Sequence, residues 1–328
     1  MDNNKYNILV VGKFREKFFE KLKEYGSVTR VDDIEDAELE DKDILVVRSK
    51  TDVNKDVVDK MKKLKLVVTA THGTDHIDEE YLEERGIQFY NNPVQSYDVA
   101  QGAIACIFAH STNLLEADRC MKRGEWRKKD FVGSRITGKT LGIIGCGNIG
   151  RKLAEFGSSM GMKVLGYDPY VEKKANEINF VDLDELLEKS DFVSVNVPLT
   201  EKTRCMIGED EIEEMKGGAF LINTARGGVV DERALLKALD EDKIGGAALD
   251  VFEHHRPFQK KASHYSSGVW ESRNLDDRMF GEEVSQRLAK HPKVIATPHC
   301  IAQTEEALEA KGMGVLDIIK RFIIDAEQ

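Results

Sequence analysis

The chain has 328 residues, of which 41% are hydrophobic and 33% charged, a composition that suits two globular domains with charged surfaces. Its formal net charge of −11 disfavours non-specific binding to nucleic acids, because that binding depends on lysine and arginine contacts to phosphates. No apolar run reaches the roughly 18 residues of a membrane span, and the five scattered cysteines favour neither a disulfide framework nor a metal site.

The first hundred residues alternate short apolar runs with amphipathic segments. The apolar runs predict strands at 7–11, 28–31, 43–48, 66–70 and 87–90. The amphipathic segments between them predict helices near 14–25, 54–63 and 78–85. This alternation favours a parallel sheet that is covered by helices on both faces.

A second series of strands follows a long segment that contains no helix breaker. That segment, 97–123, predicts one long buried helix that ends at Gly124. The strands of the second series are expected at 140–144, 163–167, 192–197, 219–223, 247–252 and 294–296. The segment 305–324 predicts a closing helix, and if this helix packs on the first series, the first domain is discontinuous in sequence.

A glycine-rich loop stands between a buried strand and a predicted helix. It consists of Gly145, Cys146, Gly147, Asn148, Ile149 and Gly150. In such a Gly-x-Gly-x-x-Gly loop, the glycines make a tight turn, let the backbone approach a pyrophosphate, and allow the helix to pack closely on the strand. The N-terminus of the following helix favours an anion through its unpaired N–H groups and its dipole. The loop therefore predicts a dinucleotide-binding site.

An acidic residue follows at the end of the next predicted strand. Asp168 lies 18 residues after Gly150. A carboxylate at this place can accept hydrogen bonds from the adenosine ribose hydroxyls, and it repels a 2′-phosphate. We therefore predict NAD rather than NADP as the cofactor.

Several further motifs resemble one family along nearly the whole chain. They are Thr-His-Gly-Thr-Asp-His-Ile-Asp at 71–78, Asn-Val-Pro-Leu-Thr at 196–200, Asn-Thr-Ala-Arg-Gly-Gly-Val-Val-Asp at 223–231, Ala-Leu-Asp-Val-Phe at 248–252 and Thr-Pro-His at 297–299. Together they resemble the D-isomer-specific 2-hydroxyacid dehydrogenases. That family includes D-lactate, phosphoglycerate, glyoxylate/hydroxypyruvate, formate and phosphite dehydrogenases.

The β/α series and the resemblance together predict the fold. We expect an α/β protein with two doubly wound parallel-sheet domains, in which a Rossmann NAD-binding domain is inserted into a flavodoxin-like substrate domain. The substrate (catalytic) domain is expected to take residues 1–100 plus 300–328. The NAD-binding domain is expected to take residues 101–299.

Two residues of these motifs suit the chemistry of the family. Hydride transfer between a carbinol carbon and nicotinamide needs a group that holds the substrate carboxylate and an acid/base at the carbonyl oxygen. Arg226 can bind carboxylate and carbonyl oxygens through its planar guanidinium. His299 can donate or accept the proton, because the unperturbed pKa of histidine is about 6.5. We predict that both are catalytic.

The resemblance also implies a wider set of binding residues. For the substrate it implies Arg226, the backbone N–H groups of His72 and Gly73, and Arg48, which is otherwise a surface charge at a strand end. For the cofactor it adds to the glycine loop and Asp168 the residues Pro198, Thr203, Thr224, Ala225, Arg226, Asp250 and His299. No metal is expected.

One position departs from the family pattern. Relatives read Asp-Val-Phe-x-x-Glu-Pro, and that Glu holds the catalytic His and raises its pKa. In this chain the position falls on His255 or Arg256, neither of which is acidic. A carboxylate from Glu253 or from an inserted segment at 258–283 replaces it, or His299 works unassisted, or turnover is lost.

Two functions follow from these observations. The first is an NAD-dependent dehydrogenase that acts on a small D-2-hydroxy acid or 2-oxo acid. The alternative, prompted by the missing Glu, is an NADH-sensing, weakly catalytic or non-catalytic protein of the same fold that binds a partner protein. The resemblance implies a homodimer, with segment 97–123 supplying much of the interface. The sequence lacks a signal peptide and a regulatory domain after residue 328, so we expect a cytoplasmic protein without allosteric control.

Overall fold

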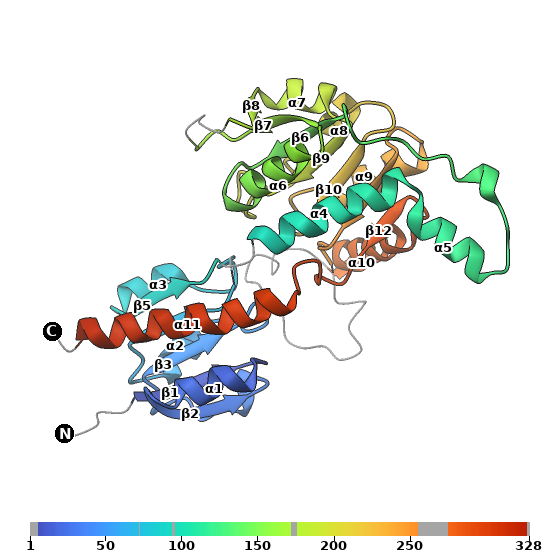
Figure 1. Cartoon of the computed structure of the whole chain (residues 1–328). Helices are drawn as coiled ribbons and strands as arrows, with labels where there is room; N and C mark the ends of the chain where they lie inside the picture. The colour runs from blue at the N-terminus through green and yellow to red at the C-terminus, as the bar shows by residue number, and fades with distance from the viewer. Residues whose placement is uncertain (1–5, 72, 94–95, 172–175, 255–274, 327–328) are drawn as a thin grey trace. The chain divides into compact units, whose positions relative to one another are not determined.

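The computed structural model describes residues 6–71, 73–93, 96–171, 176–254 and 275–326, with side chains from residue 281 onward in the last of these ranges (Figure 1). These residues form two compact units. Unit 1 comprises 6–93 and 303–326, and unit 2 comprises 96–254 and 275–302. Unit 2 is therefore inserted into the chain of unit 1.

Unit 1 is built on a five-stranded parallel sheet. In sheet order its strands are β2 (Gly26–Val31), β1 (Tyr6–Val11), β3 (Ile44–Val47), β4 (Leu66–Thr69) and β5 (Gln88–Asn91). Every neighbouring pair is parallel. This order is that of flavodoxin-like folds, in which the strand order reverses beside the first strand.

Helices cover both faces of this sheet. On one face α1 (Glu16–Leu22) and α11 (Glu305–Ala326) share an apolar core with Ile8 and Val10 of β1. On the other face α2 (Lys55–Lys60) and α3 (Glu79–Glu84) share a core with Leu9 and Val11. Successive residues of β1 thus point to opposite faces, as the period of a strand requires. A short 3₁₀ helix, η1 (Ile34–Asp36), follows β2.

Unit 2 is built on a seven-stranded parallel sheet. In sheet order its strands are β12 (Val294–Ala296), β11 (Gly246–Leu249), β10 (Phe220–Asn223), β9 (Phe192–Val195), β6 (Thr140–Ile144), β7 (Lys163–Tyr167) and β8 (Asn179–Phe180). All pairs are parallel. The order reverses between β6 and β9, which is the point where a Rossmann fold binds its dinucleotide.

The helices of unit 2 also divide between the two faces of the sheet. One face packs against α4 (Ser96–Ser111) and α6 (Asn148–Ser159). The other face packs against α7 (Leu183–Lys189), α8 (Glu209–Glu214), α9 (Glu232–Asp240) and α10 (Leu275–Lys290). The prediction of two doubly wound parallel-sheet domains, one of them a Rossmann domain inserted into a flavodoxin-like domain, is confirmed.

The segment 97–123 is not one long buried helix, so this expectation was wrong. Helix α4 ends at Ser111, and α5 (Leu114–Lys122) begins after Asn113, whose φ of 53° lies in the left-handed region. Asparagine adopts this conformation more readily than most residues, so the chain can turn there without glycine. The predicted closing helix is confirmed as α11. In the described part of the chain, no helix is long and apolar enough to cross a membrane.

Candidate active site

The glycine loop joins β6 to α6, and its glycines have different surroundings. Gly145 has a φ of 90°, and a Cβ there would lie 2.7 Å from the carbonyl oxygen of Asn196 beyond β9. A Cβ on Gly150 would lie 2.2 Å from the carbonyl oxygen of Gly145, so α6 packs directly on the end of β6. Beside Gly147, by contrast, no atom lies within 4 Å of the Cβ position.

The start of α6 fits the phosphates of a dinucleotide. Gly147 is its N-cap and provides no side-chain hydrogen bond, and Asn148 and Ile149 form the first turn. The N–H groups of this turn therefore lack a side-chain cap, and the open space beside Gly147 lets an anion approach them. These features fit the role that the sequence predicts for the loop.

Asp168 follows β7 and holds the glycine loop. Its Oδ2 accepts a hydrogen bond of 2.9 Å from the N–H of Cys146, and its Oδ1 accepts one of 2.9 Å from the N–H of Tyr170. A carboxylate has about four lone-pair sites, so these bonds leave acceptor capacity for ribose hydroxyls. The bond to Cys146 is a second role that the spacing of the motif did not indicate.

A tight turn follows β9 at the predicted cofactor residues Pro198 and Thr203. The hydroxyl of Thr203 donates to the carbonyl oxygen of Pro198 at 2.6 Å and accepts from the N–H of Thr200 at 2.8 Å. Thr203 therefore shapes this turn beside the point where the strand order reverses.

The loop that carries Arg226 follows β10 and is held by a buried asparagine. The side chain of Asn223 accepts from the N–H of Ala225 at 3.1 Å and donates to the carbonyl oxygen of Arg226 at 3.0 Å. The guanidinium of Arg226 donates to the carbonyl oxygen of Ala225 at 2.8 Å. Thr224 is buried, and its hydroxyl has no hydrogen-bond partner among the described residues. Asn223 thus fixes the backbone on both sides of Arg226.

The turn that carries His299 follows β12 and is held by Asp250. The buried carboxylate of Asp250 accepts from the hydroxyl of Thr297 at 2.6 Å, from the N–H of Cys300 at 2.9 Å and from the N–H of Ile301 at 3.3 Å. His299 has a φ of 52°, an uncommon conformation for a non-glycine residue. Asp250 therefore holds in place a turn whose backbone is strained at the predicted acid/base.

In unit 1 the predicted substrate residues follow the neighbouring strands β3 and β4. Arg48 follows β3, and its guanidinium donates to the carbonyl oxygen of Lys13 at 2.9 Å. The loop after β4 is tied by Thr71, whose hydroxyl donates to the carbonyl oxygen of Gly73 at 2.8 Å and lies 2.7 Å from the hydroxyl of Thr69. His72 lies outside the described residues.

A buried histidine supports the same loop. The Nε2 atom of His76 lies 2.9 Å from the hydroxyl of Thr69. Thr71 and His76 belong to the motif at 71–78, and no local pattern indicated a role for Thr69. Their hydroxyl and imidazole groups form one chain of hydrogen bonds beneath Gly73.

Residues 104–300 match the NAD-binding domain model of the D-isomer-specific 2-hydroxyacid dehydrogenases. The chain belongs to this family. A D-3-phosphoglycerate dehydrogenase of Methanocaldococcus jannaschii is 39% identical over 325 residues, which cover 96% of this chain and 57% of that protein. A hydroxypyruvate reductase of Thermotoga maritima is 37% identical over 278 residues, which cover 84% of this chain and 83% of that protein.

A solved structure of another relative has the same fold. It is a D-lactate dehydrogenase from Aquifex aeolicus complexed with NAD and lactic acid, which is 32% identical. The match has a TM-score of 0.84 and covers 97% of this chain and 96% of that one. The chain spans 57% and 48% of the length of two phosphoglycerate dehydrogenases that it matches.

In this member of the family, the departure from the family pattern falls in the loop after β11, beyond Asp250. Residues 255–274, which hold the expected Glu position and most of the inserted segment, lie outside the described residues. The backbone N–H of Glu253 donates to the buried carboxylate of Glu232 at 2.6 Å. Sequence reasoning missed Glu232, because an acidic residue in the first turn of a helix is ordinary.

The described residues offer no candidate metal centre. No group of three or more His, Cys, Asp or Glu side chains among them is arranged to hold an ion.

Proposed function

We propose that the chain is an NAD-dependent oxidoreductase that transfers a hydride between nicotinamide and a small D-2-hydroxy acid or its 2-oxo acid. One observation carries the proposal. The glycine loop and the loops bearing Arg226 and His299 follow β6, β10 and β12, so all three stand at the carboxyl edge of one parallel sheet. Ligands of doubly wound sheets bind at that edge.

Arg226 is proposed to anchor the substrate. A guanidinium can form paired hydrogen bonds with a carboxylate, and the neighbouring carbonyl oxygen of a 2-oxo acid lies within reach of the same group. The hydrogen bonds from Asn223 fix the backbone that presents Arg226, so little conformational freedom is lost on binding. This role is also the one that the family resemblance implies.

His299 is proposed to hold and transfer the proton. In reduction of a 2-oxo acid it donates a proton to the carbonyl oxygen, and in the reverse direction it accepts that proton from the hydroxyl group. NAD supplies the hydride acceptor in one direction and the donor in the other when it is bound. The strained turn held by Asp250 supports this assignment, because strained backbone is concentrated at functional sites.

Unit 1 is proposed to be the substrate domain. Arg48 and Gly73 follow adjacent strands of its sheet, and the backbone N–H of Gly73 can donate to a carboxylate, the role that the resemblance implies for His72 as well. The hydrogen bonds through Thr69 and Thr71 support a fixed position of the Gly73 backbone. Unit 2, with the glycine loop and Asp168, is proposed to bind NAD in preference to NADP.

The protein is proposed to be a homodimer that associates through an arm of unit 2. The arm, residues 112–133, leaves after Ser111 and returns to it, since the N–H of Ser134 donates to the carbonyl oxygen of Ser111 at 2.7 Å. In Figure 1 the helix α5 of this arm projects from the rest of unit 2. Its exposed apolar side chains include Leu114 at 58%, Trp126 at 80% and Val132 at 82% exposure. A second copy would cover this apolar surface.

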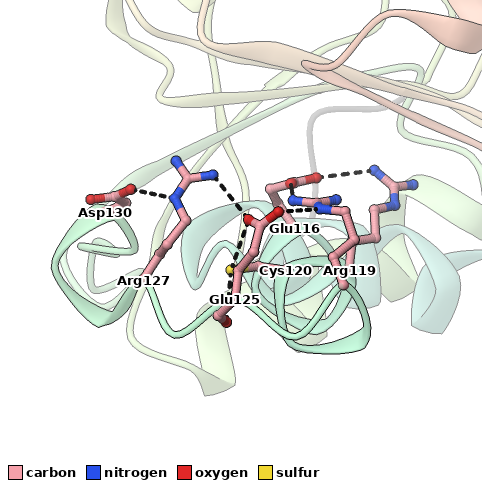
Figure 2. Close-up of polar contacts among 7 residues, drawn as sticks. Glu116, Arg119, Cys120, Glu125, Arg127 and Asp130 are labelled. Carbon is pink, nitrogen blue, oxygen red and sulfur yellow. Dashed lines mark hydrogen bonds and ion pairs between the residues drawn. The ribbon is translucent and has the colours of Figure 1, made fainter.

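Ion pairs hold the arm in shape. Arg123 pairs with Glu116 at 3.0 Å and with Glu125 at 3.1 Å. Arg127 pairs with Asp130 at 2.7 Å and lies 3.5 Å from Glu125, as Figure 2 shows. Single exposed ion pairs stabilise little, but a connected set restrains a segment in which only Cys120 is buried. A rigid arm suits a permanent interface.

The dimer is tested by substitution on the arm. Trp126→Glu should shift the mass measured by light scattering from two chains to one. Tyr90→Glu, at an exposed aromatic side chain on β5, is the control and should leave the mass unchanged. A wild-type chain that runs as a monomer would contradict the proposal.

The activity is tested by following NADH absorbance with a panel of 2-oxo acids that includes glyoxylate, hydroxypyruvate and pyruvate. We expect turnover on at least one of them. His299→Ala should lower kcat by about 10²–10⁴-fold, the usual contribution of general acid–base catalysis. His291→Asn, a histidine outside the site, is the matched control.

The same panel separates the two candidate functions. Tight NADH binding without turnover on any acid would contradict the dehydrogenase and favour the NADH-sensing alternative that the missing family Glu suggests.

All five cysteines are free thiols. Free thiols are usual in a reducing compartment, which supports a cytoplasmic location.

A further inference from the structure

A buried carboxylate stands outside the chemistry proposed above. Glu232, in the first turn of α9, is only 5% exposed. Its Oε1 accepts a hydrogen bond of 2.6 Å from the backbone N–H of Glu253. Its Oε2 accepts one of 2.5 Å from the hydroxyl of Ser285, which is fully buried in α10. One side chain thus links α9, α10 and the loop after β11.

Ser285 extends this link to the next residue of the loop. Its Oγ accepts a hydrogen bond of 3.3 Å from the backbone N–H of His254. The imidazole of His254 packs on Gly281 of α10, where an added Cβ would lie 2.3 Å from Nε2. The consecutive amides of residues 253 and 254 are therefore bound by Glu232 and Ser285, respectively.

The same stretch of loop lies against the residue that follows Arg226. An added Cβ on Gly227 would lie 2.2 Å from the carbonyl oxygen of Phe252 and 2.6 Å from the backbone nitrogen of Glu253. That nitrogen is the atom whose N–H donates to Glu232. A chain of contacts therefore runs from the carboxylate of Glu232 through the backbone of residues 252–253 to Gly227, with Arg226 one residue further.

If packing alone mattered at this position, an apolar side chain would cost less free energy than a buried carboxylate. Taking an ionisable group out of water is unfavourable unless its hydrogen bonds compensate for the lost hydration. Burial raises the pKa of Glu232 to about 7, and the neighbouring carboxylates of Glu253 and Asp231 add to the effect. Both carboxylate oxygens of Glu232 are used in fixing the loop, so the polar contacts account for the presence of an acid here.

We propose that Glu232 and Ser285 are positioning residues, which clamp the backbone of residues 252–254 against Gly227 and so orient Arg226 toward the substrate carboxylate. The clamp holds this loop from α9 and α10. It is the same loop in which the family Glu is missing. This inference rests on the proposed function only for the role of Arg226. The clamp itself is a property of unit 2 and can be measured without substrate.

The first test measures the clamp directly by hydrogen–deuterium exchange of the amides at 252–254. Glu232→Leu and Ser285→Ala each remove an acceptor of the loop amides and should raise their exchange rate by about tenfold or more, since a lost buried hydrogen bond is worth roughly that factor. Glu232→Gln keeps a hydrogen bond at both positions, because its amide oxygen can accept from the N–H of Glu253 and its amide nitrogen can donate to the hydroxyl of Ser285. This variant should therefore keep exchange slow.

The second test separates positioning from a general loss of stability. With the preferred 2-oxo acid, Glu232→Leu and Ser285→Ala should raise KM by about tenfold with a smaller change in kcat, and should leave the dissociation constant of NADH within twofold. Glu232→Gln should restore KM. Asp240→Asn is the matched control, because it removes the exposed ion pair with Arg287 that also joins α9 to α10 but does not touch the loop.

The outcomes distinguish the two proposals. If no 2-oxo acid is turned over, the proposed function fails, and the exchange measurement still decides the clamp. Unchanged exchange at 252–254 in both Glu232→Leu and Ser285→Ala would overturn the clamp. Faster exchange with an unchanged KM would overturn the link to Arg226, and so would an equal rise in KM in the Asp240→Asn control.

Discussion

The glycine loop after β6 and the segment after β11 belong to the same sheet, but they are built in different ways. In the glycine loop the closest contacts are between backbone and backbone, as between Gly150 and Gly145 and between Gly145 and Asn196. After β11, side chains hold backbone that is distant in sequence: Asp250 holds the turn at 297–301, and Glu232 holds residue 253. A site of the first kind is visible as a motif, whereas a site of the second kind can lose a motif residue and still be held.

The largest effect is expected when Asp250 is replaced by alanine. The hydroxyl of Thr297 and the N–H groups of Cys300 and Ile301 would lose their acceptor. We expect unfolding free energy to fall by about 3 kcal/mol, the scale for unpaired buried donors, and kcat to fall by at least about 100-fold as His299 loses its fixed turn. Urea denaturation and NADH oxidation measure the two. Wild-type kcat in a folded variant would show that the turn does not depend on Asp250.

The second effect is a pH dependence of the unfolding free energy that comes from Glu232, in the segment after β11. The pKa of Glu232 is raised by burial from its ordinary value of 4.5 to about 7, so the folded state disfavours its charged form. Its contribution to stability is therefore fully present below about pH 4.5 and is lost as pH rises through 7. The loss amounts to about 3 kcal/mol, since one pKa unit is worth about 1.4 kcal/mol.

This prediction is checked by urea denaturation of the wild type and Glu232→Gln between pH 5 and 9. The wild type should lose stability relative to the variant between pH 5 and about 7 and then stay level, because the amide of the variant does not titrate. The titratable neighbours, Asp231, Glu253 and His254, are present in both proteins, so their own titration contributes to both curves. A constant difference between the two proteins would count against a raised pKa at Glu232.

The third effect separates two glycines of the same loop. An alanine methyl at Gly150 would meet the carbonyl oxygen of Gly145, so Gly150→Ala should lower stability by about 1–3 kcal/mol and weaken NADH binding. At Gly147 no atom lies within 4 Å, so Gly147→Ala should fold normally and weaken NADH binding only. Thermal unfolding and NADH fluorescence titration measure both. Normal NADH affinity in Gly147→Ala would contradict the proposed position of the dinucleotide phosphate beside Gly147.

The smallest effect concerns cofactor choice. Asp168→Asn removes the charge that repels a 2′-phosphate but keeps an oxygen that can accept from Cys146. We expect the ratio of NADPH to NADH dissociation constants to fall by about tenfold, or about 1.4 kcal/mol. Asp182→Asn, at the N-cap of α7, is the control and should leave the ratio unchanged. An unaltered ratio in Asp168→Asn would leave Asp168 as a brace of the loop alone.

Regular, local patterns let the sequence predict most of the fold. Apolar runs predicted the strands of both sheets, because buried parallel strands are nearly continuous in hydrophobic residues. The division of 97–123 into α4 and α5 was not predicted, because one left-handed asparagine, Asn113, breaks a helix without any glycine or proline. The two-residue strand β8 was also missed, since so short a strand has no measurable periodicity.

By itself, the sequence determined the family, the position of the glycine-rich loop and the parallel sheets, because these depend on motifs and periodicities within short stretches of chain. Only the tertiary structure decided which side chains hold those motifs. Asp250 on the turn of His299 and Glu232 with Ser285 on residues 253–254 are the particular cases. The partners in these two sets are 21 to 53 positions apart. Hydrogen bonds of this kind form only after the chain has brought distant segments together, so no local pattern records them.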